Sequence, residues 1–149
     1  MKLFTIIFLS LFIGKGCDSK TQDDLKTMVI EYTANTRGFY QKIVIQNQTI
    51  SVSKNRDEKN MPTSKKLSDT DWNFLVTEFQ KIKLDEMANY KGATEKRFYD
   101  GAPIGSFTII HKEKNYSCGS FDAGTPPVEI DKFVNKVVEL GNANYKEIK

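Results

Sequence analysis

Apolar and polar residues alternate along several segments after Met28, and this period of two is typical of half-buried β-strands. Polar turns separate the segments, as expected for hairpins. The alternating segments are residues 28–34, residues 39–46 and 49–53 around Asn47-Gln48, and residues 104–121 around a turn at 113–115. The pattern predicts an antiparallel sheet of about five strands.

Two segments change to the helical period of about 3.6 residues. Residues 68–82 place their large apolar side chains on one face, and we expect Trp72 and Phe79 on that face to be buried. Residues 128–140 form the second predicted helix, which we expect to end at Gly141. The first helix is expected to cover the apolar face of the first hairpin.

The order strand, strand, helix occurs twice, over residues 39–82 and 104–140. The simplest arrangement of these elements is a single two-layer α+β domain, with an antiparallel sheet and both helices on one face. We place this domain at residues 28–141 and expect a polar tail over residues 142–149. The pattern assigns no element to residues 84–101.

The chain begins with the features of a secretory signal peptide. Lys2 precedes the apolar run of residues 3–13, which is too short for a membrane-spanning helix of about 20 residues. A small residue then precedes Cys17, as in bacterial lipoprotein signals, although Lys15 is unusual there. We expect residues 1–16 to be removed and Cys17 to carry lipid.

Residues 17–27 are polar and are predicted to tether the lipid to the domain. The alternative is an ordinary secreted protein, in which Cys17 is removed or pairs with Cys118. If Cys17 is lipidated, Cys118 is a lone thiol, and a lone buried thiol usually behaves as a small, inert apolar residue.

The charge of the chain argues against a nucleic-acid partner. The 149 residues include 22 Lys and Arg and 19 Asp and Glu, for a formal net charge of +3. Lys2 and Lys15 lie in the predicted signal peptide, so the rest of the chain is close to neutral. Nucleic-acid-binding domains usually carry a clustered basic surface. No nucleic-acid partner is therefore predicted.

The chain lacks the sequence motifs of common catalytic and metal sites. It has no Gly-rich phosphate loop, no Cys-x-x-Cys or His-x-x-x-His pair and no Gly-x-Ser-x-Gly motif. One His, His111, and two Cys are too few for a typical zinc site. We predict no metal, no cofactor and no catalytic residue. The alternative is a catalytic pair in which His111 acts as the base for a Cys118 nucleophile.

Four polar residues in or beside turns are candidates for contact with a partner: Arg37, Tyr40, Asp100 and Asp122. Turn chemistry and solubility explain such residues without a function. The functional interpretation is a patch that binds a protein or a glycan, since loops carried on a rigid sheet often form binding sites.

The lipoprotein-like signal, residues 32–40 (YTANTRGFY) and residues 122–126 (DAGTP) before a short helix resemble small lipoproteins of Bacteroidetes-type bacteria. The resemblance extends over most of the chain. It implies a cell-envelope location and no established activity, so it transfers no functional residues to this sequence.

We therefore expect a non-enzymatic lipoprotein of the cell envelope, held on a bacterial membrane by lipid at Cys17, that binds a protein or an envelope polymer. Two alternatives stay open: a small secreted hydrolase that uses carboxylates or Cys118, and an inhibitor or immunity-type protein. A deep cleft with facing carboxylates, or an exposed Cys118 near His111, favours the hydrolase. A flat or convex face of aromatic and charged residues favours binding.

Overall fold

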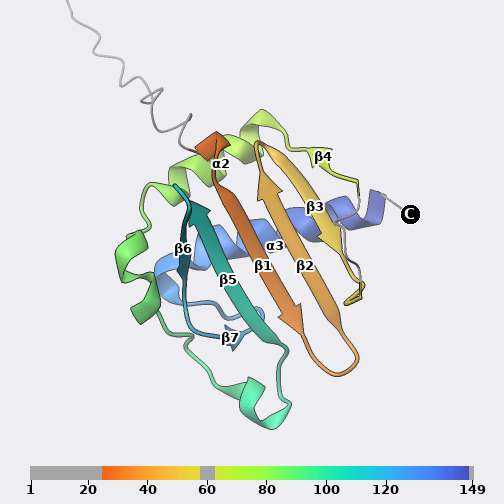
Figure 1. The fold of residues 1–149 in the computed structure, drawn as a ribbon. Coiled ribbons are helices and arrows are strands. Elements are labelled where there is room, and N and C mark those ends of the chain that lie inside the picture. The colour runs from red at the N-terminus through yellow and green to blue at the C-terminus, as the bar shows by residue number, and fades with distance from the viewer. Residues whose placement is uncertain (1–24, 58–62, 148–149) are drawn as a thin grey trace, which may run out of the picture.

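The computed structural model describes residues 25–57 and 63–147, so the predicted signal peptide and Cys17 lie outside the described residues (Figure 1). The strands are β1 (Val29–Asn35), β2 (Tyr40–Gln46), β3 (Thr49–Ser53), β4 (Lys65–Lys66), β5 (Ile104–His111), β6 (Lys114–Ser117) and β7 (Phe121–Asp122). The long helices are α2 (Asp69–Phe79) and α3 (Asp131–Glu147), and the short 3-10 helices are η1 (Leu84–Asn89), η2 (Lys96–Tyr99) and η3 (Val128–Ile130).

β1 occupies the centre of an antiparallel sheet. It pairs with β2 on one side and β5 on the other, and the strand order is β4-β3-β2-β1-β5-β6, with β7 paired to the start of β5. The alternating sequence directs every second side chain to the core, so Ile30, Ile43 and Phe107 are each at most 1% exposed. The predicted α+β class and antiparallel sheet are confirmed.

Within the described residues the sheet contains seven strands, whereas the sequence predicts about five. The additional strands β4 and β7 have two residues each, which is too short to show a period. β7 arises because β6 ends at Ser117 and the chain rejoins β5 only at Phe121. This break places both Cys118 and Phe121 on the core side, although strict alternation would direct them to opposite faces. The ring packs over Gly105, where a Cβ would lie 2.8 Å from Phe121 Cε2.

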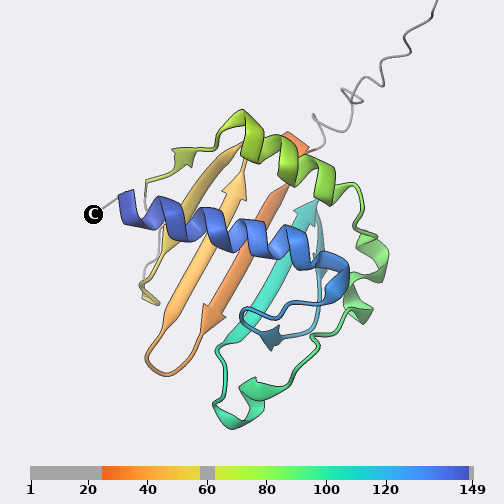
Figure 2. The same ribbon diagram turned by 180° about the vertical axis from the view of Figure 1, so that it is seen from behind.

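Both long helices lie on the same face of the sheet, as predicted (Figures 1 and 2). Ser68 caps α2, since its Oγ accepts a hydrogen bond from the Asp71 amide at 3.1 Å. Trp72 is buried as expected, whereas Phe79 at the end of α2 is only half-buried. Lys136 of α3 forms an ion pair with Asp71 at 2.9 Å and so joins the two helices.

α3 rather than α2 covers the first hairpin, which corrects the expectation from the sequence. α3 crosses the sheet over β1, β2 and β3 and continues to Glu147, beyond the predicted end at Gly141 (Figure 2). Gly141 lies inside α3 because its missing side chain lets the helix approach the sheet. A Cβ there would lie 2.8 Å from Ile43 Cγ1. Residues 142–147 are therefore helical rather than a tail.

The boundaries of the folded domain also differ from those predicted. Leu25, assigned to the tether, is 1% exposed in the core, and its carbonyl accepts a hydrogen bond from the Met28 amide. Residues 84–101, which had no predicted element, form η1 and η2. Phe98 and Tyr99 of η2 lie outside the core and are mostly exposed.

Candidate functional site

The predicted contact residues gather at one end of the sheet, where the β1–β2 turn and the start of β5 meet. Asn35 at the end of β1 pairs with both Tyr40 of β2 and Ile104 of β5. Figure 1 shows η2 at the same end of the sheet. A surface pocket of about 590 Å³ opens here, lined by Asn35, Thr36, Arg37, Arg56, Arg97, Asp100, Ala102 and Ile104.

Arg56 reaches the pocket from the segment that follows β3. Its Nη2 donates hydrogen bonds to the carbonyls of Thr36 and Phe39, the second at 3.2 Å. Its guanidinium lies 5.8 Å from the centre of the Tyr40 ring, within cation–π range. These contacts hold Arg56 against the β1–β2 turn. The candidate Tyr40 does not line the pocket itself, but its ring supports Arg56, which does.

Asp122 is 1% exposed and contributes to the pocket through Arg97 rather than by direct contact, which corrects its interpretation as a surface residue. It accepts hydrogen bonds from Thr94 Oγ1 at 2.5 Å, from the Lys96 and Arg97 amides at 2.7 and 2.9 Å, and from Arg97 Nη1 at 3.2 Å. Burial raises the pKa of Asp122, but these hydrogen bonds outweigh burial and hold the pKa well below 3.8. The ionised carboxylate therefore fixes Arg97 and η2.

Arg37 and Asp100 are two exposed charges that line the pocket. Neither side chain forms a hydrogen bond or ion pair with another residue in the described part of the chain. Asp100 ends η2 with a φ of 58°, a left-handed conformation that Asp adopts more readily than most residues. Both charges are available to a ligand.

The pocket brings together every arginine of the chain. Arg37, Arg56 and Arg97 are the only arginines among 22 basic residues, and they come from three separate segments. Turn chemistry in the sequence points to Arg37 but not to Arg56 or Arg97. The scarcity of arginine was the available signal, because a planar guanidinium binds carboxylates and phosphates through paired hydrogen bonds and stacks on rings, unlike a lysine ammonium.

Two exposed aromatic side chains of η2 lie in the chain between Arg97 and Asp100, which both line the pocket. Phe98 is 71% exposed and Tyr99 is 72% exposed, and the Arg97 guanidinium lies 4.2 Å from the centre of the Phe98 ring. Large apolar side chains grouped on a surface often mark an interaction site. We name this region the hairpin-end surface; it consists of Arg37, Arg56, Arg97, Phe98, Tyr99, Asp100 and Ile104.

The remainder of the sheet face that lacks helices carries polar side chains that bind each other. Thr33 Oγ1 lies 2.6 Å from Ser106 Oγ, and Lys42 Nζ lies 3.7 Å from the Glu31 carboxylate. These pairs account for four of the polar side chains along β1, β2 and β5 without a ligand. The hairpin-end surface is therefore the stronger candidate on this face.

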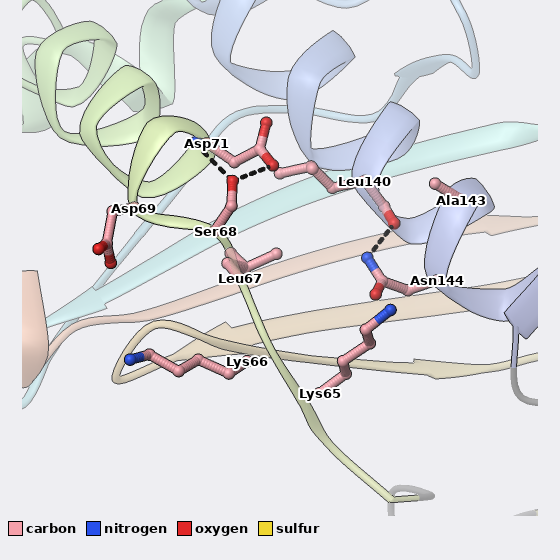
Figure 3. Close-up of a pocket in the computed structure, with 9 residues that line it drawn as sticks. All are labelled: Lys65, Lys66, Leu67, Ser68, Asp69, Asp71, Leu140, Ala143 and Asn144. Atoms are coloured by element: carbon pink, nitrogen blue, oxygen red, sulfur yellow. Dashed lines mark hydrogen bonds between the residues drawn. The ribbon is translucent and has the colours of Figure 1, made fainter.

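A second pocket, of about 520 Å³, lies between the start of α2 and the end of α3 (Figure 3). Its polar groups bind each other: Ser68 Oγ donates to Asp71 Oδ2 at 2.6 Å, and Asn144 Nδ2 donates to the Leu140 carbonyl at 2.7 Å. Asp71 also pairs with Lys136. These residues are explained by helix capping and helix packing, so we do not place the functional site here.

Cys118 and His111 do not form a nucleophile–base pair. Cys118 is 8% exposed, and its Sγ faces the Phe107 carbonyl at 3.9 Å. His111 lies at the end of β5, four residues beyond Phe107 and therefore about 13 Å from it along the strand. Burial raises the pKa of Cys118 to about 11, which keeps the thiol neutral.

The described residues contain neither a cluster of metal ligands nor a membrane-spanning helix. Within residues 25–57 and 63–147, no three His, Cys, Asp or Glu side chains lie close enough to share a metal ion. In the same ranges, no helix combines the length and apolar composition needed to cross a membrane.

No family model, curated protein or solved structure matches the chain.

Proposed function

We propose that the protein is a non-enzymatic lipoprotein of the cell envelope that binds a protein or an envelope polymer through the hairpin-end surface. The observation that carries this proposal is the meeting of three arginines around one pocket, with the exposed Phe98 and Tyr99 lying in the chain between Arg97 and Asp100, which both line it. Arginine and aromatic side chains are enriched at the residues that dominate binding energy in interfaces. A binding role needs only such a complementary surface.

The exposure of the two aromatic residues is costly for folding and therefore supports a binding role. Burying a Phe side chain stabilises a protein by about 1.5–3 kcal/mol relative to leaving it exposed. Phe98 and Tyr99 forgo most of that stabilisation in the isolated chain, since both are more than 70% exposed. A partner that covers them would recover it.

The position of the surface suits a protein anchored at Cys17. The described chain enters β1 at the end opposite the β1–β2 turn (Figure 1). β1 has 7 residues and spans about 20 Å. The proposed lipid anchor thus joins the domain at the end of the sheet opposite the hairpin-end surface, which leaves that surface free for a partner.

Binding accounts for the geometry better than hydrolysis does. The separation of Cys118 from His111 removes the one nucleophile–base pair considered from the sequence. The buried carboxylate near the pocket, Asp122, accepts four hydrogen bonds that hold η2 and Arg97. Asp100 is a single exposed carboxylate without a second one beside it in the pocket lining.

Affinity capture from the native envelope tests the proposal. The lipidated protein is compared with a Phe98→Ser, Tyr99→Ser variant and with a control variant, Phe74→Ser, Val128→Ser. The control changes two side chains that are also exposed, at 41% and 77%, but lie outside the surface. We expect the first variant to lose the captured partner and the control to retain it. Equal capture by both variants would contradict the proposal.

A further inference from the structure

The arginines of the pocket keep hydrogen-bond donors that the protein does not use. Arg56 donates through Nη2, and Arg97 donates through Nη1 and Nε, the latter to Ser120 Oγ at 3.3 Å. Arg56 Nε and Nη1, Arg97 Nη2 and the whole Arg37 guanidinium have no acceptor among the described residues. Because each guanidinium carries five N–H donors, the pocket presents a set of unpaired donors around one space.

Two of these guanidiniums are held in place before any ligand arrives. The carbonyls of the β1–β2 turn and the Tyr40 ring position Arg56. The buried Asp122 positions Arg97. Pre-positioned donors lose little conformational freedom on binding, which favours recognition of an acceptor by paired, charge-assisted hydrogen bonds.

The charge of the pocket matches a single negative charge. Its lining carries three arginines and Asp100, and the buried Asp122 neutralises Arg97. One positive charge remains. A carboxylate neutralises it, whereas a phosphate monoester carries nearly two negative charges at neutral pH.

The apolar side chains near the arginines indicate which chemical group lies next to the carboxylate in the ligand. Ile104 lies in the pocket lining and is 42% exposed, and the exposed Phe98 ring lies 4.2 Å from the guanidinium of Arg97, which also lines the pocket. A volume of about 590 Å³ is sufficient for a few amino-acid residues, within the usual range of about 300–1,000 Å³ for ligand sites. A peptide that presents a carboxylate next to an apolar side chain fits both features.

We propose that the three arginines bind a peptide carboxylate of the partner, with an adjacent apolar side chain against Phe98 and Ile104. This inference rests on the proposed function, because it defines the chemistry of the hairpin-end surface. A chain-terminal carboxylate and an Asp or Glu side chain share that chemistry, so the test distinguishes them.

Side-chain NMR of the ¹⁵N-labelled full-length chain provides the test. The chain has three arginines and therefore three Nε–H signals, assigned by the loss of one signal in each of Arg37→Lys, Arg56→Lys and Arg97→Lys. The probes are N-acetyl-Phe-Leu with a free carboxyl terminus, the same dipeptide as its amide, N-acetyl-Phe-Asp amide, and inorganic phosphate. Backbone amide signals of Gly38 and Gly101 provide a second readout of the same pocket.

We expect saturable shifts with one or both carboxylate probes and none with the neutral amide; the stronger carboxylate probe identifies the source. Arg37→Lys keeps the charge and removes no contact of the folded chain, so it should weaken binding roughly tenfold with an unchanged Tm. Equal response to acid and amide, response to phosphate alone, no saturable response, or full affinity in Arg37→Lys would overturn the inference.

The two proposals fail separately. If the carboxylate probes bind but the Phe98 and Tyr99 variant captures the same partner as wild type, the carboxylate site stands and the macromolecular interface is wrong. If capture depends on Phe98 and Tyr99 but no probe shifts the arginine signals, the interface stands and its carboxylate chemistry is wrong.

Discussion

Arg97 Nη1 lies 3.2 Å from Asp122 Oδ1, although 25 positions separate the two residues in the chain. The carboxylate belongs to β7, which pairs with the start of β5, and the guanidinium belongs to η2. The pair therefore fastens η2 to the sheet. Phe98 and Tyr99, which follow Arg97 directly, project from a fixed support rather than from a free loop.

Asp122→Asn should lower Tm at pH 7 because it replaces an acceptor of four hydrogen bonds with a group that also carries donors. The pKa of Asp122 is lower in the folded chain than its ordinary 3.8, so the ionised carboxylate stabilises the fold above pH 3.8. That stabilisation is lost as the pH falls below 3.8 toward the folded-state pKa. The Tm difference between wild type and variant should therefore shrink in acid, and a difference that is constant down to pH 2.5 would contradict this role.

Gly141→Ala should destabilise the protein by up to about 2 kcal/mol. Helix propensity alone favours Ala by about 1 kcal/mol, but the added Cβ would overlap Ile43, which is fully buried, and overpacking costs about 1–3 kcal/mol. Urea unfolding measures the difference. The double variant with Ile43→Val, which removes the Cδ1 atom, should lose less stability than the sum of the single variants. A stabilised Gly141→Ala protein would show that the contact is unimportant.

His111→Phe should stabilise the protein by about 1 kcal/mol. His111 Nδ1 is buried without a hydrogen-bond partner in the described part of the chain, and such groups carry an uncompensated desolvation cost. The ring packs edge-on against Phe79, with 6.3 Å between centroids, and Phe retains that contact. Thermal unfolding provides the measurement. His111→Gln removes the ring but keeps polar atoms, so a gain in that control as well would contradict the explanation.

Cys17→Ser should release the protein from the membrane fraction, because lipid on this residue is the expected anchor. The chain should then appear in the soluble fraction with an unchanged Tm, since the core starts at Leu25 among the described residues. Cell fractionation and mass spectrometry of the mature N-terminus test this expectation. A wild-type protein that is already soluble and begins elsewhere would contradict it.

The sequence predicted the elements whose side chains repeat with a clear period. The alternation at Ile30, Tyr32, Ile43 and Ile45 identified β1 and β2, because one face of these strands is buried and the other is not. Prediction from the periodic pattern fails where a single tertiary contact outweighs that pattern. Gly141 resembles a helix end but lies within α3, since packing against Ile43 requires the missing side chain.

The candidate site was predictable only in part, for a different reason. Arg37 and Asp100 were chosen from turn chemistry, and both line the pocket. Arg56 and Arg97 could not be placed beside them, because their proximity depends on the sheet order and on the buried carboxylate of Asp122. Long-range contacts of this kind leave no periodic signal in a single sequence.

Photo-crosslinking in intact cells tests the central claim most directly. A photoreactive amino acid is placed at Tyr99 on the hairpin-end surface or at Val128, a control position that is 77% exposed outside this surface. We predict one dominant crosslinked product from position 99, its loss when Arg37→Gln is added, and no such product from position 128. No product from position 99, or an equal product from position 128 that persists with Arg37→Gln, would contradict the proposal that this surface binds the partner.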